Sequence, residues 1–207
     1  MPRSLFAFSI FYGGMVCIAG VLGNKQVALG PLAVEAGIFP FLMLVVTSSA
    51  VAELHGAERA NSLVRLGFVP LVAAILLTFL VLALPASPEM DPARLEGFNL
   101  TLGQSWRLMI AGIIAYGTSQ TLNVFLFDRL RAGTSLPWLR GAVAAGLSQI
   151  IDTLLFVTIA FYGVFPIAEL MLGQMLAKVV LSLLLVPIVI QAMIALGRRL
   201  DREGTSA

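Results

Sequence analysis

The segment Leu66–Leu84, with the sequence LGFVPLVAAILLTFLVLAL, decides the class of this protein. It contains no charged side chain, and its length matches the span of about 20 residues that a helix needs to cross a bilayer. The whole chain shares this character, because 59% of its 207 residues are apolar, 12% are charged and the mean hydropathy is +0.97. Soluble domains have roughly 45–50% apolar and about 25% charged residues. The sequence therefore excludes a soluble enzyme or a nucleic-acid binder and predicts an all-α integral membrane protein surrounded by lipid.

Six apolar segments alternate with polar or Gly/Pro-containing connections. We expect six transmembrane helices in a single domain over residues 1–207, at Ser4–Leu22, Ala28–Ala52, Leu66–Leu84, Trp106–Phe127, Gly141–Gly163 and Pro166–Leu196. In the second and sixth segments, Pro31, Pro40 and Pro187 predict kinks or a partly interfacial start, because an internal proline removes a helix hydrogen bond. The stretch Pro85–Gly103 is expected to be the one long polar connection. The first segment lacks the small-residue cleavage site of a signal peptide, so we expect it to be retained.

Basic residues are distributed unevenly between the two sides that alternating spans produce. Nine fall on the side of the termini: Arg3, Arg59, Arg65, Arg129, Arg131, Arg140, Arg198, Arg199 and Arg202. Three fall on the other side, namely Lys25, Arg94 and Arg107. Short cytoplasmic loops carry an excess of Lys and Arg. Both termini are therefore predicted to be cytoplasmic.

The cysteine and histidine content limits the chemistry of the protein. With one cysteine, Cys17, and one histidine, His55, the chain can form neither an internal disulfide nor a Cys-x-x-Cys or multi-histidine metal site. It contains no Gly-x-x-x-x-Gly-Lys-Ser/Thr loop, so it cannot use ATP by itself. We expect no metal and no cofactor, and His55 is expected at the membrane interface rather than in catalysis. The sequence leaves open whether the chain forms a homodimer.

The fifth segment carries an intramembrane carboxylate. At about 100° per residue, Gln149, Asp152 and Phe156 lie on one stripe of a helix. An amide, a carboxylate and an aromatic ring on one face suit a planar, nitrogen-rich ligand, which they can hydrogen-bond and stack against. The alternative is that Asp152 only joins helices by pairing with Lys178. An ionisable residue inside a membrane is costly and is therefore a functional hypothesis by default.

The fourth segment carries a second polar stripe. Tyr116, Gln120, Asn123 and Phe127 recur at the spacing of one helix face. Such a stripe forms either a wall of a ligand site or a contact between helices, since uncharged amides in membranes contribute about 0.6 kcal/mol on average to helix association. The sequence alone does not choose between these two interpretations.

Two further charged residues lie in or next to the apolar segments. Lys178, one turn after Gln174, is too deep in the sixth segment to reach water easily. It needs a counter-charge, and Asp152 and Glu53 are the candidates. Glu53 shares a helix face with Ser49 at the end of the second segment. It is either a site residue at the cytoplasmic mouth or a solvated acid at a helix end.

A set of short motifs extends in order along nearly the whole chain. They are Gly23-Asn24-Lys25, Ala52-Glu53-Leu-His-Gly56, Gln120 with Asn123-Val-Phe, Trp138-Leu-Arg140, Ser148-Gln149-Ile-Ile-Asp152-Thr153-Leu-Leu-Phe156, Ile159-Ala-Phe161-Tyr-Gly163, and Lys178 ahead of Pro187. The Ser-Gln-x-x-Asp-Thr segment with its downstream Phe-x-Gly is the most specific of these motifs. Together they resemble the bacterial queuosine-precursor transporter family, also called the VUT family.

This resemblance implies a multi-pass transporter of the bacterial inner membrane, and not an enzyme. It implies the import of 7-cyano-7-deazaguanine or 7-aminomethyl-7-deazaguanine, which are precursors of queuosine in tRNA. It also implies similarity in size and topology to the substrate-capturing subunits of energy-coupling-factor vitamin transporters. The candidate substrate-binding residues are Asp152, Gln149, Phe156, Gln120, Asn123, Lys178, Glu53 and Tyr116. One departure concerns Ser49, where family members usually have an aspartate.

Three other classes of function are weighed against this interpretation. The first is a substrate-capture subunit for another nucleobase or vitamin, which would need a separate energising module. The second is an intramembrane enzyme, in which Ser148 or Ser49 would act with Lys178 as nucleophile and base. No Gly-x-Ser-x-Gly, His-Glu-x-x-His or paired-aspartate motif accompanies these residues, so we expect no catalytic residue. The third is a channel or structural membrane protein, which saturable uptake would exclude.

Overall fold

The computed structural model describes residues 2–29, 32–103, 106–163 and 167–205 of the chain. Their elements, in order, are α1 (Arg3–Leu22), β1 (Gln26–Leu29), β2 (Leu32–Glu35), α2 (Ile38–His55), α3 (Ala57–Ala83), α4 (Pro92–Leu102), α5 (Trp106–Arg129), the 3₁₀ turn η1 (Leu130–Ala132), α6 (Pro137–Phe161) and α7 (Ala168–Thr205). Six of the described helices, all except α4, are long and apolar enough to cross a membrane. The predicted all-α membrane protein with six spanning helices is confirmed.

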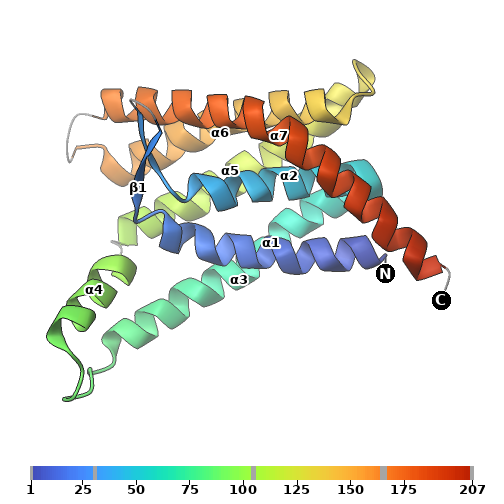
Figure 1. Cartoon of the computed structure of the whole chain (residues 1–207). Coiled ribbons are helices and arrows are strands. Elements are labelled where there is room, and N and C mark those ends of the chain that lie inside the picture. Colours follow the sequence, from blue (N-terminus) through green and yellow to red (C-terminus); the bar gives the residue numbers. More distant parts are fainter. Residues whose placement is uncertain (1, 30–31, 104–105, 164–166, 206–207) are drawn as a thin grey trace.

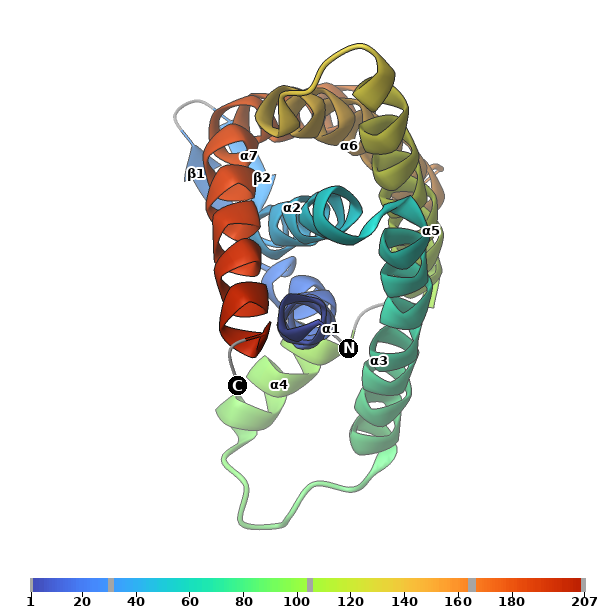
Figure 2. The ribbon, with the colours of Figure 1, turned by 90° about the vertical axis from the view of Figure 1, so that its right-hand side faces the viewer.

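Helix α2 occupies the centre of the bundle. Figure 2, which looks along the bundle, shows the other spanning helices around it, and α2 packs against all five of them. In the most apolar stretch of α2, 67% of the residues are buried, whereas only 6% are buried in the most apolar stretch of α3. A helix that is apolar on every side and is not covered by other helices faces lipid. Helix α3 is therefore a peripheral span, and α2 forms the core.

The prediction of one helix over Ala28–Ala52 is wrong in its first part. Strands β1 and β2 form an antiparallel hairpin, with Val27 opposite Val34, and α2 begins only at Ile38. The chain between the strands contains Gly-Pro, a pair that favours turns over a continuous helix. The kink predicted at Pro31 lies outside the described residues. Pro40 lies in the first turn of α2, where a missing N–H breaks no helix hydrogen bond.

The connection Pro85–Gly103 is not irregular throughout, because it contains α4. Asp91 caps this helix by accepting a hydrogen bond from the Ala93 N–H at 2.8 Å, and Pro92 occupies the first helical position. Both residue types favour a helix N-terminus. Other helices extend further than predicted: α3 and α6 start earlier, and α7 continues to Thr205. Apolar runs reveal only the part of a helix inside the bilayer, so the polar ends were missed.

Both described ends of the chain meet at one end of the bundle. The Ser4 N–H donates to Asp201 Oδ1 at 2.9 Å, and the Ser4 hydroxyl donates to Oδ2 at 2.7 Å. Figure 1 shows α7 bending part-way along before it reaches α1, and Pro187 lies inside α7 as the predicted source of a kink. The hairpin and α4 lie at the opposite end of the bundle. We call the end with Ser4 and Asp201 the termini end, and we call the end with the hairpin and α4 the hairpin end.

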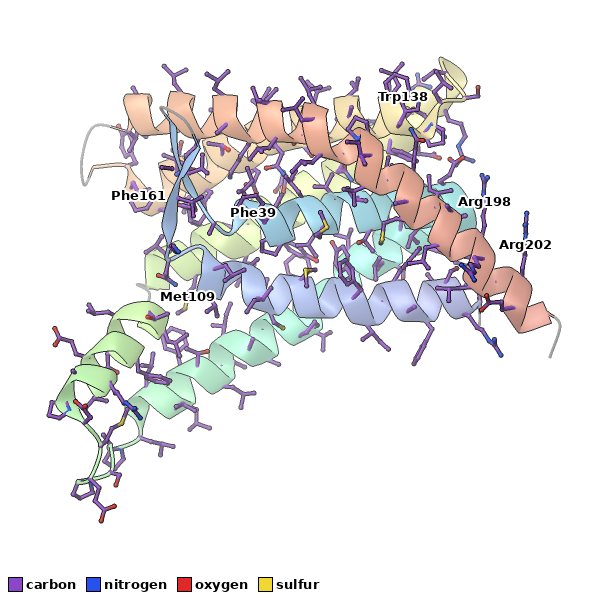
Figure 3. All side chains as sticks on the ribbon, in the orientation of Figure 1. Phe39, Met109, Trp138, Phe161, Arg198 and Arg202 are labelled. Atoms are coloured by element: carbon purple, nitrogen blue, oxygen red, sulfur yellow. The ribbon has the colours of Figure 1, made fainter. Side chains whose placement is uncertain are left out.

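The basic residues predict that the termini end faces the cytoplasm. Figure 3 shows Arg198 and Arg202 at this end. In a Cys17→Ser background, a cysteine placed at Pro88 is expected to react with a membrane-impermeant maleimide added to intact spheroplasts. A cysteine placed at Thr205 is expected to react only after permeabilisation. The reverse pattern would show the opposite orientation.

Candidate functional site

The centre of the site is an ion pair between two spanning helices. Lys178 of α7 places its Nζ 3.0 Å from Asp152 Oδ2 of α6, and both residues are buried. The Ser119 hydroxyl on α5 donates to the other carboxylate oxygen of Asp152 at 3.2 Å. The counter-charge of Lys178 is therefore Asp152 and not Glu53. Three helices meet at this carboxylate.

A cavity of about 270 Å³ lies against this ion pair. Of the candidate residues, Asp152, Lys178, Phe156 and Tyr116 line it. The lining continues toward the hairpin end through Met109 of α5, which Figure 3 labels, to Leu102 of α4. It also includes Cys17 of α1, the only cysteine of the chain. The cavity thus connects the buried ion pair with the hairpin end of the bundle.

The hairpin adds a carboxylate that the sequence analysis missed. Glu35, the last residue of β2, lines the same cavity and accepts a hydrogen bond from Gln174 Nε2 at 3.3 Å. Gln174 is buried, and its Oε1 has no hydrogen-bond partner among the described residues. Burial raises the pKa of the Glu35 carboxyl above its ordinary value, while the positive charge of Lys178 opposes this rise. An acidic residue within a predicted membrane span was the signal that could have identified it.

The polar stripe of α5 divides between the cavity and the helix contacts. The Tyr116 hydroxyl lies 3.1 Å from the Tyr12 hydroxyl and 3.1 Å from the Val64 carbonyl oxygen, and its side chain lines the cavity. Gln120 and Asn123 are buried and are not among the described lining residues. These two amides bond to residues of α2 and α1.

Gln120 and Asn123 connect α5 to the central helix. Gln120 Oε1 accepts from the hydroxyls of Ser48 and Tyr12, each at 3.4 Å. Asn123 Nδ2 lies 3.1 Å from both the Ser48 and the Ser49 hydroxyl oxygens. Ser49 is thus a hydrogen-bond acceptor for Asn123. These contacts link α5 to its neighbouring helices, while Gln120 Nε2 and Asn123 Oδ1 are buried and have no hydrogen-bond partner among the described residues.

Gln149 lies one helical turn from Asp152, toward the termini end. Its side chain is fully buried, and neither its Nε2 nor its Oε1 has a hydrogen-bond partner among the described residues. It is also not among the residues that line the cavity. Leaving a buried donor or acceptor unpaired costs about 1–3 kcal/mol. Gln149 is therefore a polar group close to the cavity that lacks a partner.

Glu53 lies away from the cavity, in what we call the termini-end cluster of Glu53, Arg131 and Arg140. Its Oε2 is 2.6 Å from Arg140 Nη2 and 3.1 Å from Arg131 Nη2. The Arg140 guanidinium also lies 4.7 Å from the centre of the Phe127 ring. Near this cluster, the His55 ring is 2.7 Å from the Ser4 hydroxyl. The structure therefore separates Glu53 from the other charged candidates.

Six membrane spans around a mostly apolar cavity that contains a buried ion pair are typical of a membrane transport protein, because such proteins bind their substrates near the middle of the bilayer. The comparison with known proteins agrees. The sequence profile of a family described as putative vitamin uptake transporter matches residues 35–192. The chain belongs to this family. It is a multi-pass transporter of the bacterial inner membrane, and not an enzyme.

Three relatives share a more specific description. The chain is 27% identical over 188 residues to a probable queuosine precursor transporter of Bacillus subtilis, covering 86% of this chain and 80% of that protein. It is 26% identical over 161 residues to the queuosine precursor transporter of Escherichia coli, covering 77% and 70%. A probable queuosine precursor transporter of Haemophilus influenzae is 28% identical over 125 residues, covering 60% and 49%. No solved structure matches the chain.

Proposed function

We propose that this chain imports 7-deazaguanine precursors of queuosine, namely 7-cyano-7-deazaguanine and 7-aminomethyl-7-deazaguanine, for tRNA modification. The observation that carries the proposal is the buried carboxylate of Asp152, which faces a cavity flanked by aromatic side chains. The names of the three relatives support the same class of substrate. Asp152 is the residue to which we assign primary recognition.

The hydrogen-bonding groups of the ligand complement those of the cavity. A 7-deazaguanine presents N1–H and an exocyclic amine on one edge, and a carboxylate can accept both of these donors. Asp152 already accepts from Ser119 and Lys178, but a carboxylate has about four lone-pair positions, so two remain. The Lys178 ammonium can donate to the O6 acceptor of the base. Phe156 and Tyr116 provide aromatic surface against which the ring can pack.

The size of the cavity favours a single base. Pockets for drug-sized ligands measure roughly 300–1,000 Å³, and the volume of about 270 Å³ lies just below this range. A bicyclic base with a small C7 substituent suits such a volume better than a whole nucleoside. Gln149 is proposed to complete the site, because its unpaired amide can join a hydrogen-bond network once the cavity is filled.

The termini-end cluster is proposed to close the bundle on the cytoplasmic side. Glu53 of α2, Arg131 of η1 and Arg140 of α6 hold three elements together at the end opposite the cavity mouth. With the predicted orientation, the cavity then faces the outside of the cell. Release of substrate to the inside would require these contacts to separate.

A substrate-capture subunit for another nucleobase or vitamin is the second candidate, because the family description names vitamin uptake. Such a subunit would need a separate energising module. Uptake by this chain alone, in a host without such modules, separates the two candidates. Import without a module supports the first, and binding without import supports the second.

The proposal is tested in a bacterial strain that makes no queuosine precursor and lacks its own importer. Expression of this chain together with either external precursor is expected to restore queuosine in tRNA, measured by mass spectrometry of nucleosides. The empty vector and the Asp152→Asn variant at matched membrane levels are the controls. Absence of queuosine with the wild-type chain well expressed would contradict the proposal.

A further inference from the structure

We propose that Glu35 binds a cationic arm on C7 of the ligand, so that the site prefers 7-aminomethyl-7-deazaguanine to the neutral 7-cyano form. This inference rests on the proposed function and specifies its substrate.

The described lining of the cavity has one carboxylate more than it has cations. It contains two carboxylates, Glu35 and Asp152, and one ammonium, Lys178. Lys178 is paired with Asp152 at 3.0 Å, whereas no described residue forms an ion pair with Glu35. A partly buried carboxylate without a counter-charge is costly. A ligand that brings its own positive charge removes this cost, and a neutral ligand does not.

Beside Glu35, the hydrogen-bonding atom left without a partner among the described residues is an acceptor. Gln174 Nε2 donates one bond to Glu35 at 3.3 Å, and Gln174 Oε1 is a buried acceptor without a partner in the described chain. An alkylammonium carries three N–H donors and no acceptor. A nitrile carries only an acceptor at its end, which would oppose the carboxylate oxygens. The local chemistry therefore discriminates between the two C7 substituents.

The position of Glu35 matches the position of the arm. Gln174, the partner of Glu35, lies one turn before Lys178 on α7, so that Glu35 and Lys178 approach the cavity side by side. On a 7-deazaguanine, the C7 substituent is next to O6. A base whose N1–H edge meets Asp152 and whose O6 meets Lys178 therefore directs its C7 arm toward Glu35. The same orientation satisfies all three charged groups.

The inference is tested by binding measurements on purified protein in detergent. Wild-type protein is expected to bind the aminomethyl ligand at least about tenfold more tightly than the cyano ligand, as hydrogen bonds to charged groups imply. In Glu35→Gln, the ratio of the dissociation constants of the cyano and aminomethyl ligands is expected to fall to about threefold or less. The fall comes chiefly from weaker binding of the aminomethyl ligand. Glu89→Gln, which removes an exposed carboxylate at the hairpin end, is the matched control and should keep the wild-type ratio.

A ligand series provides a readout that does not depend on the folding of a variant. The N-acetyl derivative of the aminomethyl ligand keeps the arm but removes its charge. The 7-methyl ligand is neutral and small enough to avoid any steric conflict. Wild-type protein is expected to bind both neutral ligands about as weakly as the cyano ligand.

Each outcome separates this inference from the proposed function. If wild-type protein binds the aminomethyl and cyano ligands equally well, or if Glu35→Gln weakens both to the same extent, the ammonium assignment is overturned while the proposed function stands. The second of these results would instead indicate a structural or ion-coupling role for Glu35. If neither ligand binds to wild-type protein, the proposed function and this inference both fail.

Discussion

Replacement of Asp152 by asparagine is expected to lower the affinity for 7-deazaguanine ligands by roughly tenfold to a hundredfold, because an unmatched buried hydrogen bond costs about 1–3 kcal/mol and more with charge. The substitution keeps the side-chain volume but turns one of two acceptors into a donor. That donor would face the N1–H and amine donors of the base. Titration calorimetry on monodisperse protein measures the effect directly.

The control for this substitution is Asp91→Asn. Asp91 caps α4 outside the cavity, and asparagine caps a helix as well as aspartate does. A ligand without the exocyclic amine should bind wild-type protein weakly and should distinguish little between wild type and Asp152→Asn. Unchanged dissociation constants for both ligands in Asp152→Asn would remove Asp152 from the site.

The second large effect concerns the stability of the Asp152–Lys178 pair. Lys178→Met leaves Asp152 buried without its cation, and breaking a buried pair in this way costs roughly 3–5 kcal/mol. The double variant Lys178→Met/Asp152→Asn removes both charges and is expected to be more stable than Lys178→Met alone. Thermal unfolding in detergent gives the comparison, with Lys25→Met, an exposed lysine after α1, as the control.

The double variant also separates stability from recognition. It should recover much of the folded yield lost in Lys178→Met and yet fail to import substrate, because the acceptor for the base is gone. If the two single variants are as stable as wild type, the pair has no structural role. If the double variant imports at the wild-type rate, the pair has no role in recognition.

The spanning helices could be predicted because the bilayer imposes a length on each of them. A run such as Leu66–Leu84 has no other stable environment than lipid, whatever its neighbours are. The hairpin at Gln26–Glu35 could not be found in this way, since its residues are as apolar as those of a helix. Only the Gly-Pro pair between its strands indicated a turn. Glu35 could have been identified without the hairpin, because it is an acidic residue within the predicted span Ala28–Ala52.

The site could be predicted only as far as one helix face. The sequence predicts that Asp152 and Phe156 share one face of α6, and both residues line the cavity. It did not predict that Gln149, on the same stripe, lies outside the described lining, because helix periodicity does not show where a cavity ends. The partner of Lys178 was equally undetermined. Asp152 and Glu53 are both carboxylates at suitable depths, and only the packing of α6 against α7 distinguishes them.

The central claim is that the substrate occupies the cavity beside Asp152 and Lys178, and Cys17 provides a direct test of it. This residue lines the cavity and is the only cysteine of the chain, so wild-type protein needs no engineering. We would measure the rate at which a small water-soluble maleimide modifies Cys17, with and without saturating 7-aminomethyl-7-deazaguanine. The account predicts that the ligand slows the modification several-fold in wild type and leaves it unchanged in Asp152→Asn, and that adenine protects neither protein. An unchanged rate in wild type, with a ligand that the protein demonstrably imports, would place the substrate elsewhere and contradict the account.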